Sequence, residues 1–349
     1  MNYQSIILPH IWNLKPYSSA RDEFKGKEGI FLDANENPLG SPLSENWNRY
    51  PDPMQWEIKE ELSDIKQIPA DQIFIGNGSD EAIDLIIRMT CAGQANSIIL
   101  CPPTYGMYEV SASINHVNIL SVPLTKEYQL DVEQILSTVK EDTRIIFICS
   151  PNNPTGNKIN RSDIYQIIEK FQQGFVIIDE AYIDFSDEPS FITELDKYPN
   201  VIVMQTLSKA YGLASLRLGM AFANPQIIQI LNKIKPPYNI GGATQALVLE
   251  ALRNRDFLIN SIQQINHAKN TLISKLEAMP QVIRIFPSQA NFILVKMEKA
   301  QELFDYLISQ QVITRNRSNV TLCESSIRIT VGLPEENHIL IQKMQEFYS

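Results

Sequence analysis

Short, continuous runs of apolar residues recur through the middle of this chain, and they constrain its fold more than any other feature. Six of them read as strands, at residues 97–101, 117–122, 144–149, 175–179, 201–206 and 219–223. Amphipathic segments typical of helices lie between several of them, at residues 81–90, 132–140 and 162–173. Strands that are apolar throughout are buried on both faces, and strands joined by helices run parallel. The pattern therefore predicts an α/β protein with a mostly parallel central sheet.

The chain changes character after about residue 240. Residues 242–279 contain no proline and read as one long helix, which Pro280 ends. Strands are then expected at 282–286, 292–295, 312–315 and 327–331, with helices over 299–310 and from Pro334 onward. We therefore expect an N-terminal segment (1–40) that packs with the small domain and the active site, a large domain (41–245) and a small α+β domain (246–349).

Composition restricts the kinds of partner. The 349 residues are 44% hydrophobic and carry a net charge of -10, with no dense Lys/Arg tract of the kind that binds nucleic acid. The four cysteines show no CxxC spacing and the four histidines are scattered, so we expect reduced thiols and no metal site. No stretch of about 18 apolar residues occurs. These features predict a cytoplasmic protein that binds neither membrane nor nucleic acid.

Polar residues gather where the predicted strands end. The candidates are Asn153, Asp179, Tyr182, Thr206, Ser208, Lys209 and Arg217. Ligands of open α/β sheets bind at the carboxyl ends of the strands, so these side chains are expected to share one site. The amine of Lys209 can form a Schiff base with an aldehyde, and the carboxylate of Asp179 can keep a pyridine nitrogen protonated. With hydroxyls and a guanidinium to hold a phosphate, the set matches the needs of pyridoxal phosphate.

Three further segments are candidates for the same site. Residues 76–81 precede a predicted helix, whose first N–H groups attract phosphate, although on its own this segment is more simply a capped turn. Tyr105 follows the strand 97–101 and can stack on a flat ring, or can simply pack at a helix start. The loop SPNNPTG (150–156) is made rigid by two prolines, and the amide of Asn153 can donate a hydrogen bond to a cofactor oxygen.

Two arginines stand thirteen residues apart in the predicted small domain, Arg315 and Arg328, and Arg328 lies inside an apolar run. Such an arginine needs either an ion-pair partner or a pocket. A salt bridge satisfies that need, and so does a cavity in which two guanidiniums bind a carboxylate or a phosphate. Arg317 adds a third cation to this region. Which arginine binds a substrate phosphate therefore stays open.

The motifs CSPNNPTG (149–156), DEAY (179–182) and TLSK (206–209), together with Arg217, resemble those of the fold-type I, pyridoxal-phosphate-dependent aminotransferases. More narrowly, LDANENPLG (32–40), YPD (50–52), CPPTYGMY (101–108) and Arg315 with IRITVG (327–332) are similar to the histidinol-phosphate aminotransferase family. The resemblance implies a three-layer transferase fold, with a mostly parallel sheet in the large domain and a smaller α+β domain. It also implies a homodimer with shared active sites.

The resemblance implies a role for each matching residue. Lys209 would bind pyridoxal 5'-phosphate as a Schiff base and shuttle a proton. Asp179 would pair with the pyridine nitrogen, Tyr182 and Asn153 would hydrogen-bond the phenolic oxygen, and Tyr105 would stack on the ring. The cofactor phosphate would be held by Ser79, Asp80, Thr206, Ser208 and Arg217, and by Tyr50 of the neighbouring subunit.

On the substrate side, the resemblance implies contacts from Tyr17, Asn153, Arg315 and Arg328. The reaction implied converts L-histidinol phosphate and 2-oxoglutarate into imidazole-acetol phosphate and L-glutamate, a step of histidine biosynthesis. Two alternatives on the same scaffold stay open, an aminotransferase for aromatic amino acids and a phosphothreonine-type decarboxylase. A third alternative, a non-catalytic domain that senses the cofactor, is disfavoured by the intact lysine at position 209.

Overall fold

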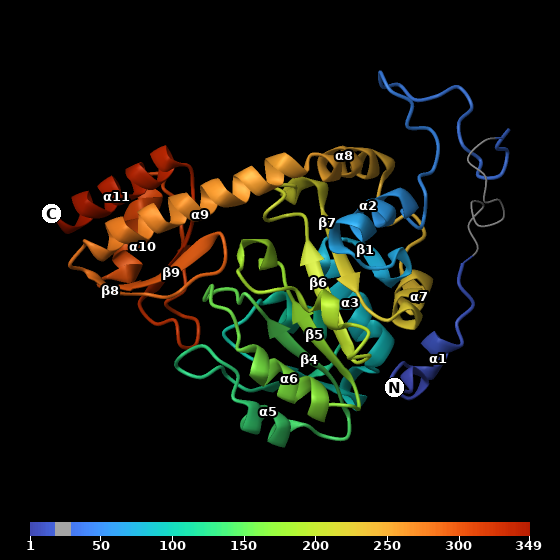
Figure 1. Ribbon diagram of the computed structural model, residues 1–349, viewed down its shortest axis with the longest axis horizontal. Coiled ribbons are helices and arrows are strands. Elements are labelled where there is room, and N and C mark those ends of the chain that lie inside the picture. The colour runs from blue at the N-terminus through green and yellow to red at the C-terminus, as the bar shows by residue number, and fades with distance from the viewer. Residues whose placement is uncertain (18–28) are drawn as a thin grey trace.

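Two β-sheets divide the chain into a large and a small part. The computed structural model describes residues 1–17 and 29–349. Residues 73–222 contribute a seven-stranded sheet, and residues 282–330 contribute a four-stranded one. Two helices, α8 (Gly242–Arg253) and α9 (Arg255–Glu277), run along one side of the molecule and join the two parts (Figure 1).

The large sheet is parallel except for one strand. Its strand order is β1-β7-β6-β5-β4-β2-β3. The strands are β1 (Ile73–Asn77), β2 (Ser97–Leu100), β3 (Asn118–Ser121), β4 (Thr143–Cys149), β5 (Phe175–Asp179), β6 (Val201–Thr206) and β7 (Leu218–Phe222). β7 is antiparallel to both of its neighbours, β1 and β6. The segment between β6 and β7 holds only a 3-10 turn, Ala214–Leu216, which is too little for the crossover that a parallel pair requires.

Helices cover both faces of this sheet. They are α2 (Trp56–Lys66), α3 (Ser79–Thr90), α4 (Met107–Ile114), α5 (Val132–Thr138), α6 (Arg161–Lys170) and α7 (Pro225–Ile234). Successive strand residues point to opposite faces, so β4 places Ile146 and Ile148 in one hydrophobic cluster and Ile145 and Phe147 in the other. The first cluster includes residues of α2, α5 and α6, and the second those of α3, α4 and α7. This arrangement confirms the predicted three layers.

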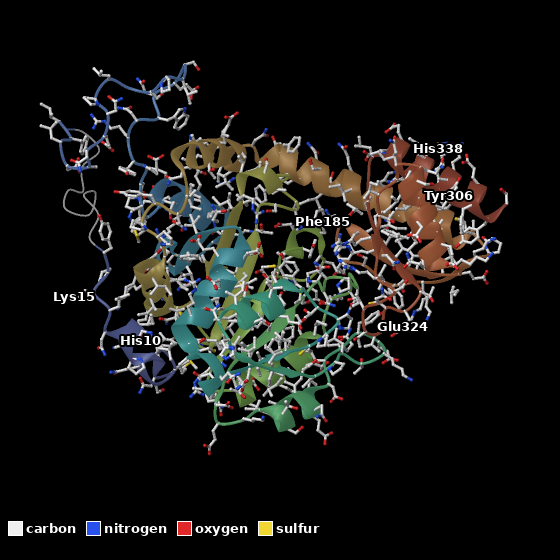
Figure 2. All side chains as sticks on the ribbon, turned by 180° about the vertical axis from the view of Figure 1, so that it is seen from behind. His10, Lys15, Phe185, Tyr306, Glu324 and His338 are labelled. Carbon is white, nitrogen blue, oxygen red and sulfur yellow. The ribbon has the colours of Figure 1, made fainter. Side chains whose placement is uncertain are left out.

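The first residues of the chain pack on the large part. Tyr3, Ile6 and Ile7 belong to the cluster under α3 and α7. The N–H of Leu8 donates to the carbonyl of Met89 at 2.9 Å, just before the short helix α1 (Pro9–Trp12). Figure 2 shows residues of this segment at one end of the molecule and residues of the small part at the other. Among the described residues of the N-terminal segment, those around positions 3–8 therefore pack on the large part.

The small part is an antiparallel sheet of order β10-β11-β9-β8, covered on one face by helices. Its strands are β8 (Val282–Ile285), β9 (Phe292–Met297), β10 (Arg315–Asn316) and β11 (Ser326–Thr330). Val295, Ile327 and Ile329 pack in one cluster with residues of α9, α10 (Ala300–Ser309) and α11 (Pro334–Tyr348). Leu294 instead belongs to a cluster of the large part. The second face of the small sheet is therefore directed towards the large part.

Two expectations for individual elements were wrong, and one strand was missed. The predicted helix over residues 242–279 is interrupted at Asn254, whose φ of -95° and ψ of 64° are not helical. Asparagine readily leaves the helical region because its side chain competes for backbone hydrogen bonds. The strand expected at 312–315 is reduced to β10, and β1 was not predicted at all. Among the described residues, no helix has the length and apolar character needed to cross a membrane.

Candidate active site

The parallel strands β4, β5 and β6 end side by side, and a cavity opens at their carboxyl ends. Their registered pairs place Cys149 beside Asp179, and Asp179 beside Met204. The cavity encloses about 530 Å³, including the solvent at its mouth. Its wall is formed by Ser79, Asp80, Tyr105, Cys149, Asn153, Asp179, Ala181, Tyr182, Thr206, Ser208, Lys209 and Arg217. Every cofactor residue proposed from the sequence lies here except Tyr50. Cys149 and Ala181 were not foreseen.

Asp179 ends β5 and is buried at the bottom of the site. Its Oδ2 accepts a hydrogen bond from the hydroxyl of Tyr108 at 2.5 Å, and its Oδ1 accepts one from the N–H of Ala181 at 3.0 Å. Burial raises the pKa of the Asp179 carboxyl, and both hydrogen bonds oppose that rise. The carboxylate is therefore held in one orientation by two donors.

Sequence reasoning assigned no role to Tyr108. The ring is fully buried and stacks on Phe147 with 4.6 Å between centroids. It meets the ring of Tyr105 edge-on at 5.5 Å. Tyr105 lies two residues before α4, so helical spacing did not link it to Tyr108.

Lys209 follows β6 and reaches into the cavity. Its Nζ lies 5.5 Å from the centroid of the Tyr182 ring. Burial lowers the pKa of Lys209, and the nearby guanidinium of Arg328 lowers it further, while Asp179 acts in the opposite direction. Both main effects favour the neutral amine, which is the nucleophilic and proton-accepting form.

One end of the cavity has the donors that a phosphate requires. Ser79 is the first residue of α3, so backbone N–H groups at the start of this helix are available to an anion. Gly78 has a φ of 75°, and a Cβ there would lie 2.5 Å from Nη2 of Arg217. The hydroxyl of Thr206 lies 3.0 Å from that of Ser208. A helix start, two hydroxyls and a guanidinium thus converge, with glycine required for the close approach.

This donor set fits pyridoxal phosphate. The donors for the phosphate lie at one end, and the same wall contains Asp179, whose buried carboxylate can pair with a pyridine nitrogen. The phenol of Tyr182 keeps its proton, since burial raises its pKa well above the usual value. Lys209 supplies the amine for an aldehyde. Each polar group of the cofactor therefore has a matching side chain.

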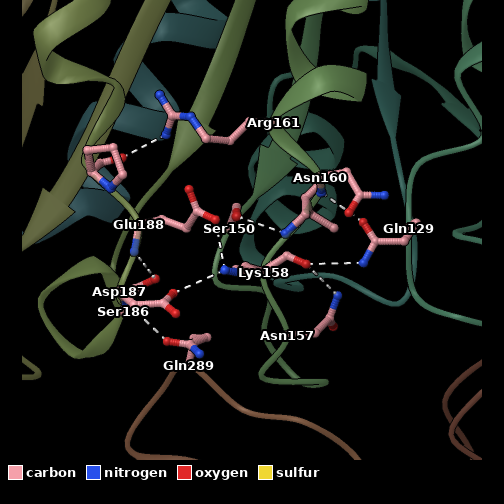
Figure 3. A network of polar contacts seen from close by, with 12 residues as sticks. Gln129, Ser150, Asn157, Lys158, Asn160, Arg161, Ser186, Asp187, Glu188 and Gln289 are labelled. Carbon is pink, nitrogen blue, oxygen red and sulfur yellow. Dashed lines mark hydrogen bonds and ion pairs between the residues drawn. The ribbon is translucent and has the colours of Figure 1, made fainter.

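A polar network surrounds Lys158, two residues after the loop 150–156 (Figure 3). Lys158 pairs with Asp187 at 3.1 Å and with Glu188 at 2.8 Å. The N–H of Asp187 donates to Oε1 of Gln289, which belongs to the segment leading into β9. These contacts connect the chain just after the loop both to the segment after Tyr182 and to the small part.

Of the two arginines proposed from the sequence, Arg328 reaches the cavity wall. Its Nη1 donates to Oδ1 of Asn153 at 2.5 Å, and its guanidinium lies 5.1 Å from the Phe292 ring. Because Asn153 accepts this bond through its oxygen, its amide N–H groups remain available as donors. Arg315 lies directly opposite Arg328 in the ladder of β10 and β11, and it is exposed.

Four predicted residues do not line the cavity: the two arginines just described, Tyr17 and Tyr50. Tyr17 has 74% of its surface exposed and does not contribute to the wall. Tyr50 is 49% exposed and stacks on Tyr238 at 4.4 Å between ring centroids. Over the residues that the structure describes, no group of three or more His, Cys, Asp or Glu side chains is arranged to hold a metal ion.

Comparisons with known proteins point in the same direction. The family model described as "Aminotransferase class I and II" matches residues 32–344. A histidinol-phosphate aminotransferase of Cytophaga hutchinsonii is 53% identical over 98% of each chain, and one of Parabacteroides distasonis is 48% identical over 98% of each chain. The solved histidinol-phosphate aminotransferase of Sinorhizobium meliloti, in complex with pyridoxal-5'-phosphate, shares the fold with a TM-score of 0.78 at 24% identity, over 90% of each chain.

The structural likeness confirms the transferase fold that the sequence motifs predicted. The sequence identities of 53% and 48% over 98% of each chain show the family as well as the fold. The chain therefore belongs to the class I and II aminotransferases and, within them, to the histidinol-phosphate aminotransferase family.

Proposed function

We propose that this chain transfers the amino group of L-histidinol phosphate to 2-oxoglutarate, giving imidazole-acetol phosphate and L-glutamate in histidine biosynthesis. The observation that carries the proposal is the placement of Lys209 and Asp179 in the wall of one cavity, which has phosphate donors at one end. Relatives at 53% and 48% identity are named for this activity. The four cysteines are buried and free, which suits an enzyme of the reducing cytoplasm.

The cofactor is pyridoxal 5'-phosphate. When bound, it supplies an aldehyde that takes up the substrate amine and a pyridine ring that withdraws electrons from the neighbouring carbon. Asp179 would pair with the ring nitrogen, Tyr182 and Asn153 would hydrogen-bond the phenolic oxygen, and Tyr105 would stack on the ring. The residues that hold its phosphate are Ser79, Asp80, Thr206, Ser208 and Arg217.

Lys209 carries out the proton transfers. Its pKa is lowered by burial and by Arg328, so a larger fraction of the amine is neutral than for a lysine in water. Nζ would accept the proton from the substrate carbon that bears the amino group and deliver it to the former aldehyde carbon of the cofactor, and the second half-reaction would move a proton in the opposite direction. Burial keeps the Tyr182 phenol protonated, so its hydroxyl remains a hydrogen-bond donor, and its ring centroid lies 5.5 Å from Nζ. General acid–base catalysis of this kind contributes roughly 10²–10⁴-fold to a rate.

The small part binds the charged end of each substrate. Arg328 lies beside Asn153, and Arg315 lies opposite it in the ladder. Guanidinium groups bind phosphate and carboxylate oxygens through paired N–H donors, so the same residues can serve both half-reactions. Arg315 and Arg328 bind the phosphate of histidinol phosphate first, and the carboxylates of 2-oxoglutarate or glutamate second. Tyr17 encloses the substrate from the N-terminal segment.

The active enzyme is a homodimer. Large apolar side chains are exposed along residues 29–56 of the described chain, among them Ile30 (91%), Leu32 (90%) and Leu39 (93%). Exposed apolar side chains in such a run favour an interface over contact with water. Tyr50 lies in the same segment and remains half-exposed. In a dimer this segment covers the second copy, and Tyr50 reaches the cofactor phosphate of the neighbouring site.

The test is a single-turnover spectrum of the yellow, cofactor-loaded protein. We expect rapid bleaching on mixing with L-histidinol phosphate, and recovery of the colour on addition of 2-oxoglutarate. Bleaching with L-phenylalanine but not with L-histidinol phosphate would move the enzyme to the aromatic aminotransferases and refute the substrate proposal. A protein that never becomes yellow with added pyridoxal phosphate would refute the cofactor assignment as well.

A further inference from the structure

Three arginines share the face of the small sheet that is directed towards the large part. Arg315 is paired with Arg328 in the ladder of β10 and β11, and the N–H of Arg317 donates to the carbonyl of Ser326 at 2.9 Å, one step further along. Arg317 directly follows β10, and its hydrogen bond continues the ladder, so it lies on the same face as Arg315 and diagonal to Arg328. Asn316 points to the opposite face and contacts Gln301 of α10.

This cluster has no negative partner within the described residues. None of the three guanidiniums forms an ion pair there, although like charges opposite each other in a ladder destabilise it. The Nε of Arg317 is buried and makes no hydrogen bond to any described residue. Burial lowers the pKa of Arg317 to about 10, and the charges of Arg328 and Arg315 contribute to that shift.

Arg317 is linked to the active site through Arg328. Arg328, its diagonal neighbour, contacts Asn153 in the cavity wall. A half-buried cation with an unpaired donor, next to a second half-buried cation, is stabilised by a bound anion.

We propose that Arg317 is a third anion-binding residue of the active site, and that with Arg328 it selects substrates that carry a phosphate. This inference rests on the proposed function and extends it. A phosphate carries about two negative charges and three acceptor oxygens at neutral pH, so it gains more from a third guanidinium than a carboxylate does. Arg317 therefore contributes most to the first half-reaction, and Arg328 contributes to both.

The experiment compares cofactor-loaded wild type with Arg317→Gln in single turnovers, using L-histidinol phosphate and unphosphorylated L-histidinol as donors. For wild type we expect a preference for the phosphorylated donor. In Arg317→Gln we expect the rate with a low concentration of L-histidinol phosphate to fall by about 10- to 150-fold, because one charge-assisted hydrogen bond to the substrate is lost. The rate with L-histidinol should be unchanged, and inorganic phosphate should compete less well with it.

Two further variants separate charge loss from misfolding. Arg284→Gln removes the same charge from exposed β8 of the same sheet, and it should keep the wild-type preference. Arg317→Lys keeps the charge but loses the paired donors, so its preference should fall between the two. Suppose that wild type prefers the phosphorylated donor. If Arg317→Gln then lost the same rate with both donors, or lost none, the role of Arg317 would be overturned while the proposed function would stand. A wild type without that preference would overturn both.

Discussion

Lys209 provides the most direct test at the scale of single residues. In the part of the chain that the structure describes, it is the sole lysine in the cavity wall. Its replacement by alanine removes the amine that binds the cofactor and moves the proton. We expect Lys209→Ala to lose its yellow colour with added pyridoxal phosphate and to lose at least about 100-fold in turnover. Absorbance spectra and a coupled glutamate assay measure the two effects.

The matched control for this variant is Lys343→Ala. Lys343 lies on α11 and pairs with Glu346 at 2.7 Å on the surface of the small part. Its loss should leave both colour and turnover unchanged. A Lys209→Ala protein that turned over normally would remove the basis of the assignment.

Tyr108 acts one step away from the chemistry, through Asp179. Replacing Tyr108 by phenylalanine keeps the stack on Phe147 but removes the donor to Oδ2 of Asp179. That hydrogen bond opposes the rise in the pKa of Asp179, so its loss raises the pKa further. We expect the cofactor-free variant to be less stable by about 1.5–3 kcal/mol above the folded-state pKa of Asp179, where the buried carboxylate is charged and has lost a donor.

The pH dependence of that loss identifies its cause. A carboxyl group whose pKa is raised in the folded state holds its proton more tightly when folded, so the protein loses stability as pH rises through that pKa. Tyr108→Phe raises the pKa again, so its deficit should be full above the folded-state pKa and should shrink as pH falls below it. Urea unfolding of both proteins from about pH 8 towards the acid side measures this. A deficit independent of pH would indicate lost packing and exclude a role in holding the charge.

At the scale of elements, the start of α3 is fixed by its contact with β7. A Cβ at Gly219 would lie 2.1 Å from the backbone nitrogen of Ser79, too close for any side chain. Gly219→Ala must therefore displace either β7 or the helix start that the cofactor phosphate needs. We expect a loss of about 1–3 kcal/mol in the free energy of unfolding, together with weaker binding of pyridoxal phosphate.

Gly241→Ala is the comparison variant for this prediction. Gly241 precedes α8, has a φ of -65°, and a Cβ there would meet nothing within 4 Å. Its free energy of unfolding should change by less than about 0.5 kcal/mol. If Gly219→Ala bound the cofactor as tightly as Gly241→Ala, the position of the helix start would not matter for phosphate binding.

The elements also show what a single sequence can predict. β5 and β6 were predicted to the residue because their apolar runs end at Asp179 and Thr206. β1 was missed because its last residues, Gly76 and Asn77, have the composition of a turn. The antiparallel direction of β7 depends on how the chain returns after Lys209, which periodicity does not encode.

The candidate site, like the strands, was predictable in part from the sequence. Residues at strand ends were brought together because parallel strands share a carboxyl edge. Tyr108 matters because it contacts Asp179, which is 71 residues away in the sequence. Arg317 matters because the ladder of β10 and β11 places it beside Arg328. Such contacts between distant parts of the chain leave no local signal in hydrophobic pattern or motif spacing.

At the scale of the whole molecule, the proposed dimer decides whether each active site is complete. Tyr17 and Tyr50 lie outside the cavity of their own chain. If the segment around Tyr50 covers a second copy, a charge in that segment should separate the subunits. We expect Leu39→Asp to shift the protein from dimer to monomer in sedimentation experiments, because a charge in an apolar interface remains unpaired. A monomeric wild type would contradict the dimer itself.

The composite site can be tested by mixing two inactive proteins. In a mixed dimer of Lys209→Ala and Tyr50→Ala, one site combines an intact Lys209 with an intact Tyr50 from the other chain. Random exchange of subunits makes about half of the dimers mixed, so about a quarter of all sites should be complete and activity should return to that level. If Tyr50 served the site of its own chain, every site in the mixture would lack one residue. Activity would then stay at the level of the separate variants, and Tyr50 would belong to its own subunit.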